Sequence, residues 1–270
     1  MIRPRPISEL PSSDASAIRF VLFDIDDTIT ENGLLSEASF STIWALRRSG
    51  LVPIPVTGRP AGWCDLIARQ WPVGGVIGEN GAFAFFMDRG VLRSLYHPSA
   101  PPPNSARNRL YELAEDALHE IPGLRFAKDQ AYRVFDVALD FAEEQPRLGL
   151  DSASRVKAIF EKGGAHAKIS SIHVNAWLGD YDKLSMAEFF LSSIFAWDPI
   201  LSPRAVLYFG DSPNDEPMFG RFELSCGVAN MRRFESIMER LPAFITEASH
   251  GAGFAEGCAI VLKRRLPGDS

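Results

Sequence analysis

Carboxylates placed just after short apolar runs are the residues of this sequence whose types and spacing could do chemistry. The apolar run at residues 18–23 is followed by three of them: Asp24, Asp26 and Asp27. A second run, at residues 205–209, is followed by Asp211 and Asp215. Each run suits a buried strand of a parallel sheet, and such sheets bind ligands outside the carboxyl ends of their strands. We therefore expect the two groups of carboxylates to share one crevice.

Carboxylates that share a crevice repel one another, and the repulsion raises the pKa of some members. A divalent cation removes that cost. Mg²⁺ prefers oxygen ligands and keeps several waters, so two or three carboxylates suit it better than they suit zinc. The joint pattern therefore predicts a Mg²⁺ site, although a single Asp after a strand is more often a turn former or a helix N-cap.

Other polar residues stand at matching positions of the pattern: Thr57, Gly58 and Arg59 after the apolar run at residues 51–56, Lys183 before the second run, and Asn214 between Asp211 and Asp215. Alone, each has an ordinary explanation. Thr57 would be a cap, Gly58 a tight turn and Arg59 a surface arginine at a helix start. Their order along the chain, each beside an expected strand or helix, indicates a single site.

In that order the fragments resemble the four motifs of the haloacid dehalogenase superfamily of phosphotransferases. Residues 24–28 (Asp-Ile-Asp-Asp-Thr) resemble the first motif, Thr57 the second, Lys183 the third, and residues 210–215 (Gly-Asp-Ser-Pro-Asn-Asp) the fourth. The resemblance covers nearly the whole chain. It is to the branch with a large cap inserted between the second and third motifs, as in sucrose-phosphate and mannosyl-phosphoglycerate phosphatases. Asp27 stands where the first motif usually has Gly, a substitution also seen within the superfamily.

The resemblance implies a phosphatase that acts on a small phosphate ester, a sugar phosphate above all, through an aspartyl phosphate. Asp24 would be the nucleophile and Asp26 the general acid and base, and this second Asp favours phosphate transfer over dehalogenation. The phosphate- and substrate-binding positions implied are Thr57, Gly58, Arg59, Lys183 and Asn214. The implied Mg²⁺ ligands are Asp24, Asp211, Asp215 and the backbone carbonyl of Asp26.

Two other functions stay open at this point. Hexose-phosphate mutases exist with a similar cap, so the chain could return the phosphate to a sugar instead of to water. A member of the superfamily could also have lost catalysis and serve as a binding or regulatory module. The second alternative is disfavoured because every catalytic position is filled by the expected residue type.

The order of the apolar runs predicts an α/β fold: a Rossmann-like parallel-sheet core with an inserted α+β cap, which has an antiparallel sheet with helices on one face. The expected domains are a flexible arm rich in Pro and Ser at 1–17, the core at 18–81 and 179–270, and the cap at 82–178. The expected core helices are 36–49, 60–70 and 183–195, and the expected cap helices 104–120 and 151–162. Cap strands are expected at a hairpin spanning 82–96 and at 124–128, 132–140, 165–169 and 171–178. Pro53 and Pro55 weaken the strand at 51–56 as a central strand.

One face of the cap sheet is expected to select the substrate. The stretch at residues 171–178 alternates, with His173 and Asn175 on the face opposite Val174 and Ala176. His173 and Asn175 would hydrogen-bond a sugar-like ligand, and closure of the cap would bring them over the crevice. An ordinary solvated sheet face is the alternative.

Composition excludes several other classes. Among 270 residues, 28 Lys and Arg face 34 Asp and Glu, a net charge of −6, so no nucleic-acid partner is expected. Cys64, Cys226 and Cys258 lack the spacing of a disulfide framework or a zinc site and fit a reducing compartment. No apolar run approaches the ~20 residues of a membrane span. Arg3 and Arg5 precede no apolar stretch, so no signal peptide is expected and the predicted location is the cytoplasm.

Overall fold

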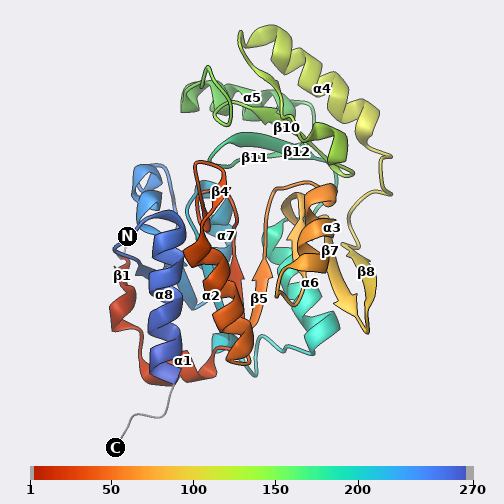
Figure 1. Cartoon of the computed structure of the whole chain (residues 1–270). Coiled ribbons are helices and arrows are strands. Elements are labelled where there is room, and N and C mark those ends of the chain that lie inside the picture. The colour runs from red at the N-terminus through yellow and green to blue at the C-terminus, as the bar shows by residue number, and fades with distance from the viewer. Residues whose placement is uncertain (1–2, 266–270) are drawn as a thin grey trace, which may run out of the picture.

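A six-stranded parallel sheet forms the centre of the computed structural model, which describes residues 3–265 (Figure 1). In spatial order its strands are β1 (Arg5–Pro6), β15 (Phe244–Ile245), β14 (Leu224–Gly227), β13 (Val206–Gly210), β2 (Phe20–Phe23) and β5 (Val52–Pro55). Neighbours pair in parallel throughout. Every residue of β2 and β13 is buried, which explains their continuous apolar sequence. The carboxyl ends of these strands lie on the edge that faces the cap.

Helices cover both faces of this sheet. They are α1 (Ser12–Ala17), α2 (Glu37–Arg48), α3 (Ala61–Gln70), α6 (Lys183–Phe195), α7 (Glu216–Arg221) and α8 (His250–Arg265). Alternate strand residues face opposite layers: Phe23 and Phe209 pack on Phe254 of α8, whereas Leu22 and Tyr208 share a cluster with residues of α6. The predicted α/β class and the three predicted core helices are confirmed.

Strand β5 shows how a strand can hold two prolines. The backbone N–H groups of Val52 and Val56 donate to carbonyls of β2 and its neighbour Arg19, so the nitrogens of Pro53 and Pro55 point away from β2. On that outer side a single bridge joins Val56 to β6 (Val76–Gly78). The prolines therefore occupy positions at which no donor to β2 is required.

The predicted flexible arm at residues 1–17 is wrong for residues 3–17. Strand β1 pairs with β15, and η1 (Ile7–Glu9) and α1 pack against α8. Ile7 and Leu10 are fully buried in the core. The Pro and Ser content suggested mobility, but these apolar side chains find a partner helix at the far end of the chain. Residues 1 and 2 lie outside the described part.

The predicted hairpin exists, as β7 (Phe83–Asp88) and β8 (Val91–Tyr96), but it belongs with the core. Strand β7 pairs with β6, and Phe83 lies in the same buried cluster as Phe23. The interpretation of Phe83 as cap interior is therefore wrong. We propose that the cap begins after Tyr96 and not at residue 82.

The cap is an antiparallel sheet with two helices on its outer face (Figure 1). Its strands, in spatial order, are β11 (His166–Ile169), β12 (His173–Trp177), β10 (Asp136–Asp140) and β9 (Arg125–Phe126), and its helices are α4 (Arg107–Glu120) and α5 (Leu150–Lys162). Val174 and Ala176 pack with the helices in a core of their own. The inserted α+β architecture is thus confirmed.

The remaining short elements are β3 (Thr30–Glu31), β4 (Leu34–Leu35), η2 (Glu79–Gly81), η3 (Gln130–Tyr132), η4 (Pro203–Ala205), η5 (Pro213–Asp215) and η6 (Ala229–Phe234). Among residues 3–265, no helix is both long enough and apolar enough to cross a membrane.

Candidate active site

Three buried carboxylates meet at the carboxyl ends of β2 and β13. Asp24 directly follows β2, Asp211 directly follows β13, and Asp215 lies in η5. One carboxylate oxygen from each lies within 4.8 Å of the others. The sequence predicted this meeting, because residues that follow the carboxyl ends of parallel strands lie at one edge of the sheet; we call this the strand-end rule. We call Asp24, Asp211, Asp215 and Lys183 the strand-end cluster.

Lys183 joins two members of the cluster. Its Nζ donates to Asp24 Oδ1 and to Asp215 Oδ1, at 2.9 Å each. The side chain stands at the first turn of α6, where Asp182 caps the helix by accepting from the Ser185 N–H. Burial would lower the pKa of Lys183, but the charges of Asp215 and Asp24 outweigh it and raise the pKa. The ammonium therefore stays charged.

The cluster holds more negative charge than Lys183 can balance. Burial, opposed by Lys183 and assisted by Asp215 and Asp26, raises the pKa of Asp24 to about 7. Burial and the charges of Asp215 and Asp24 raise the pKa of Asp211 well above its usual value. A buried set made only of carboxylate oxygens with this charge excess fits a hard divalent cation such as Mg²⁺.

Asp215 is fixed by several donors. Its Oδ2 accepts from the backbone N–H groups of Asp211 at 2.9 Å and Ser212 at 3.2 Å, and Tyr208 donates its hydroxyl to Oδ1. A Cβ on Gly210 would lie 2.5 Å from Asp215 Oδ2, so the turn requires glycine. Asn214 is buried beside this turn and accepts from the Ser212 hydroxyl at 2.8 Å. Its contact with Lys183 or phosphate stays a prediction.

Asp26 points to a different partner. The chain turns directly after Asp24, since Thr28 and Ile29 donate to the Ile25 carbonyl, so Asp26 does not continue the extended chain of β2. The Asp26 carboxylate instead accepts from Arg59 Nε and Nη2, at 2.9 and 2.8 Å. A role for its backbone carbonyl as a metal ligand stays a prediction.

Arg59 connects the core to the cap. Beyond Asp26, its guanidinium donates to Asp129 at 3.2 Å and to Glu143 at 2.9 Å, and it lies over the Trp63 ring. The residue is 3% exposed, so the alternative of a surface arginine is wrong. Arg59 thus joins the predicted acid and base to cap residues.

Thr57 and Gly58 lie between core and cap. Thr57 is fully buried, and its Oγ1 accepts from the Arg59 N–H at 3.1 Å. The Gly58 carbonyl accepts from Arg133 Nη1 at 2.8 Å. A Cβ on Gly58 would lie 3.1 Å from Asn80 and 3.4 Å from Asn175, so both side chains lie against this turn.

The cap face carries His173 and Asn175 toward the core, as the alternation predicted. Asn175 Nδ2 donates to Asp136 Oδ2 at 3.0 Å, and His173 Nε2 lies 2.8 Å from Glu143 Oε2. Burial raises the pKa of Glu143, but His173 and Arg59 outweigh it and lower the pKa to about 2. His173 and Asn175 are 3% and 2% exposed, so this is no ordinary solvated sheet face.

The sequence reasoning missed most of the ionic network between the domains. Arg133 donates to Asp129 at 3.1 Å and to Asp136 at 2.9 Å, and Asn80 donates to Asp136 at 3.2 Å. Arg59, Asp129, Arg133 and Asp136 form what we call the cap–core cluster. The sequence singled out Arg59 but not Asp129, Arg133 and Asp136, which pair within one short segment and reach Arg59 and Gly58 only through the fold.

Glu79 is a further residue that the sequence analysis did not single out. Its buried carboxylate accepts from the Ala61 N–H, at the start of α3, and from the N–H groups of Val134, Phe135 and Asp136 in the cap. The bonds explain how Glu79 and Asn80 can both adopt a positive φ. Burial and the charge of Asp136 raise the pKa of Glu79 to about 7.

Two further residues reach Asp211 from η6. Asn230 Nδ2 donates to Asp211 Oδ2 at 3.1 Å, and Arg233 Nη2 lies 3.3 Å from the same oxygen and 2.9 Å from Asp27. The strand-end rule could have found them, since η6 directly follows the carboxyl end of β14.

No protein-family model and no curated protein matches the sequence. Solved structures do match its fold. The C-terminal domain of the trehalose-6-phosphate phosphatase of C. albicans superposes with a TM-score of 0.70 at 14% identity, over 97% of this chain and 98% of that one. The chain has the haloacid dehalogenase fold. A COF-like hydrolase of that type from Plasmodium vivax (TM-score 0.67, 15% identity, 93% and 99% coverage) and a subclass IIB sugar phosphatase (0.61, 13%, 89% and 98%) share it.

Within the haloacid dehalogenase fold the strand-end cluster occupies the crevice at the carboxyl ends of the core strands, beneath the cap. The predicted residues Asp24, Lys183, Asp211 and Asp215 are brought together there. Asp26 and Arg59 lie beside them on the cap side.

Proposed function

We propose that the protein is a Mg²⁺-dependent phosphatase that hydrolyses a small phosphorylated metabolite, a sugar phosphate above all. The observation that carries the proposal is the strand-end cluster, in which a buried aspartate at a strand end is 2.9 Å from an ammonium and is grouped with two more carboxylates. The names of two structures with this fold, a trehalose-6-phosphate phosphatase and a sugar phosphatase, support the substrate class.

In the first step a carboxylate oxygen of Asp24 attacks phosphorus, and the bond to the leaving oxygen breaks as Asp26 gives that oxygen a proton. The product is an aspartyl phosphate. In the second step Asp26 takes a proton from water, the water oxygen binds phosphorus, and Asp24 leaves. Lys183 and Thr57 hold the phosphate oxygens while their charge shifts.

Asp24, Asp211 and Asp215 would hold the Mg²⁺, together with the backbone carbonyl of Asp26. The ion would neutralise the excess charge of the cluster and of the phosphate, which allows the two anions to approach. Asn230 and Arg233 keep Asp211 oriented for this purpose through their bonds to Oδ2.

The cap would select the substrate through His173 and Asn175. Both side chains are buried against the core, and each is paired with a carboxylate that a sugar hydroxyl could replace as partner. We expect His173→Ala and Asn175→Ala to raise KM for the preferred sugar phosphate and to change p-nitrophenyl phosphate hydrolysis less. Equal effects on both substrates would remove the cap face from substrate selection.

The test of the function is phosphate release from p-nitrophenyl phosphate and a panel of sugar phosphates, in Mg²⁺ and in EDTA. We expect turnover that EDTA abolishes and Mg²⁺ restores. Phosphate release without a divalent cation would show that no metal is required. No phosphate release with any cation would favour a binding module. Isomerised monophosphate from a hexose 1,6-bisphosphate, in place of free phosphate, would establish a mutase.

A further inference from the structure

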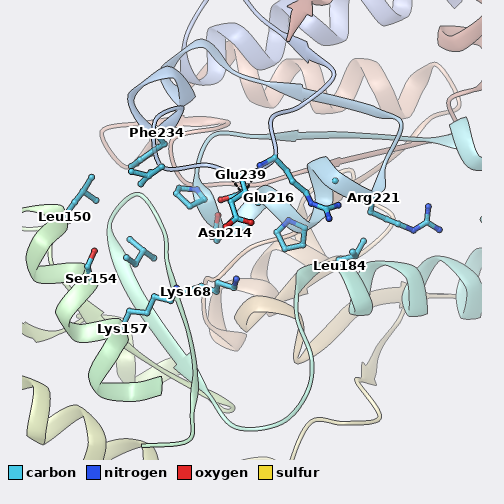
Figure 2. A pocket seen from close by; sticks show the side chains of 16 residues that line it. Leu150, Ser154, Lys157, Lys168, Leu184, Asn214, Glu216, Arg221, Phe234 and Glu239 are labelled. Carbon is cyan, nitrogen blue, oxygen red and sulfur yellow. Dashed lines mark hydrogen bonds between the residues drawn. The ribbon is translucent and has the colours of Figure 1, made fainter. Parts of the chain in front are cut away.

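A cavity of about 650 Å³ opens between the cap and the core, and Asn214 is one of the residues that line it (Figure 2). Residues of α5 and β11 form its cap wall, and residues of η5, α7 and the segment 234–240 form its core wall. Lys157 and Lys168 approach it from the cap side, and Asn214 and Glu216 lie across from them.

The cavity adjoins the candidate active site through both walls. On the core side, Asn214 stands between Asp211 and Asp215, and Leu184 directly follows Lys183. On the cap side, Lys168 is the register partner of Asn175, so the two side chains share the sheet face that looks at the core. Strand β11 itself lies against η5.

The opposite side of the crevice is already filled. There Arg59, Arg133 and Asp136 are buried and bonded to one another or to Asp129, and Asn80 and Asn175 complete the packing over Gly58. A leaving group attached to a phosphate at Asp24 therefore finds open room on the side of the cavity, whereas on the other side it would first have to displace the carboxylate partners of His173 and Asn175.

Four basic side chains line the cavity: Lys157, Lys168, Arg221 and Arg240. Arg221 is paired with Glu188 at 2.7 Å, and Lys157 has Glu161 at 3.6 Å. Within residues 3–265, Lys168 and Arg240 have no carboxylate oxygen within 4.0 Å. They stand on opposite walls.

Two acidic residues also line the cavity, Glu216 and Glu239, and neither carboxylate lies within 4.0 Å of a side-chain nitrogen of Lys168 or Arg240. Glu216 is committed to the core wall, where its Oε2 accepts from the backbone N–H groups of Glu239 and Arg240 at 2.9 and 3.1 Å. In a chain with a net charge of −6, two unpaired cations facing one cavity beside a phosphate site indicate an anionic ligand.

We propose that this cavity receives the leaving group of the substrate, and that the leaving group carries its own carboxylate or second phosphate, which Lys168 and Arg240 bind. The proposal rests on the phosphatase function above and narrows its substrate class to phosphate esters with a second acidic group. The apolar side chains of Leu184, Ile169 and Phe234 on the same walls suit the carbon skeleton between the two anionic groups.

The test compares matched substrates that differ in the second charge: 6-phosphogluconate against glucose 6-phosphate, and fructose 1,6-bisphosphate against fructose 6-phosphate. We expect the wild-type kcat/KM to favour the anionic member of each pair. Lys168→Gln and Arg240→Gln should each reduce that preference on the order of tenfold, mainly through KM, because each removes one charged contact. Lys128→Gln, an exposed lysine on the cap outside the cavity, should leave the preference unchanged.

Binding measured by calorimetry keeps this proposal separate from the phosphatase function. Asp24→Asn protein should bind 6-phosphogluconate more tightly than glucose 6-phosphate, and Lys168→Gln and Arg240→Gln together, added to it, should abolish the difference. Equal binding of the two sugars, or a preference that survives both cavity substitutions, would overturn the proposal while p-nitrophenyl phosphate hydrolysis still supports the function. Absent hydrolysis together with selective binding would overturn the function and support an anion-binding cavity.

Discussion

The strand-end cluster and the cap–core cluster lie in one crevice, and both are buried and rich in carboxylates, yet their hydrogen bonding differs. In the cap–core cluster, Asp136 accepts from Arg133, Asn175 and Asn80, and Asp129 accepts from both guanidinium groups. Asp24 accepts one side-chain bond within residues 3–265, from Lys183. Buried carboxylates that are fully bonded hold structure, whereas one left short of donors is set up for a ligand.

This comparison teaches that burial and charge alone do not mark an active site. An active site is indicated by carboxylates with too few positive partners in the protein, because the bound cation must supply the missing positive charge. The predictions change the charge of a residue in one of the clusters or bonded beside it, and the measured response is activity or stability.

The largest effect is expected for Asp24→Asn. An amide cannot form the aspartyl phosphate, so hydrolysis of p-nitrophenyl phosphate in Mg²⁺ should be abolished while the circular-dichroism spectrum and the unfolding midpoint stay close to wild type. Asp65→Asn is the matched control, since Asp65 is a partly exposed residue that pairs only with Arg69. Near-wild-type hydrolysis by Asp24→Asn would refute the nucleophile.

Asp26→Asn should slow turnover by ~10²–10⁴-fold, the usual range for loss of general acid–base catalysis. Because p-nitrophenolate leaves without much help from an acid, the loss should be larger for a sugar phosphate than for p-nitrophenyl phosphate. Steady-state kinetics on both substrates measures the difference. An equal loss would mean that Asp26 acts through its bond to Arg59 and not by proton transfer.

In the cap–core cluster the expected effect is on stability. Arg133→Met leaves the buried Asp136 without its guanidinium and Asp129 with that of Arg59 alone, which should cost about 3–5 kcal/mol in the free energy of unfolding by urea. Arg155→Met, which removes an exposed pair with Glu120, should cost about 1 kcal/mol or less. Similar losses in the two variants would mean that the cap–core cluster does not stabilise the protein.

The sequence predicted the strand-end cluster because that prediction depends only on which residues directly follow a strand. A polar residue after a buried strand must lie at the sheet edge, so Asp24 and Asp211 could be brought together without any knowledge of tertiary contacts. Other local patterns predicted the core helices and, through the period of two along a strand, the alternation of His173 and Asn175. The strand-end rule could have been applied to η6 and would have found Asn230.

The rest depended on contacts that no local pattern shows. Arg59 and Glu143 are 84 residues apart, and Glu79 and Asp136 are 57 apart, so neither pair can be inferred from spacing. The N-terminal segment was misjudged for the same reason, since Ile7 and Leu10 are buried by the distant helix α8. The hairpin β7–β8 was placed in the cap because pairing with β6 leaves no mark on its own sequence.

The smallest expected effect is on the pH dependence of the free energy of unfolding, and it distinguishes Asp24 of the strand-end cluster from Glu79, which is bonded to the cap. The pKa values of Asp24 and Glu79 are both raised to about 7 in the folded protein, above their ordinary values near 4. A raised carboxyl pKa stabilises the protonated folded state, so stability is highest at low pH and is lost as the pH rises toward 7. Without metal, each group should lower the free energy of unfolding by roughly 1 kcal/mol per pH unit between pH 5 and 7.

Mg²⁺ should separate the two contributions. At saturating Mg²⁺ the ion favours ionised Asp24, so the share of Asp24 in the pH dependence should vanish. The share of Glu79, which among residues 3–265 is bonded only to backbone N–H groups, should persist. Urea unfolding of the wild type from pH 5 to 7, in EDTA and in Mg²⁺, measures both slopes. In EDTA, Asp24→Asn should lose the Asp24 share of the slope and keep the share of Asp211, whose pKa is also raised. If Mg²⁺ left the slope unchanged, the strand-end cluster would not be the cation site, and the distinction between the two clusters would lose its chemical basis.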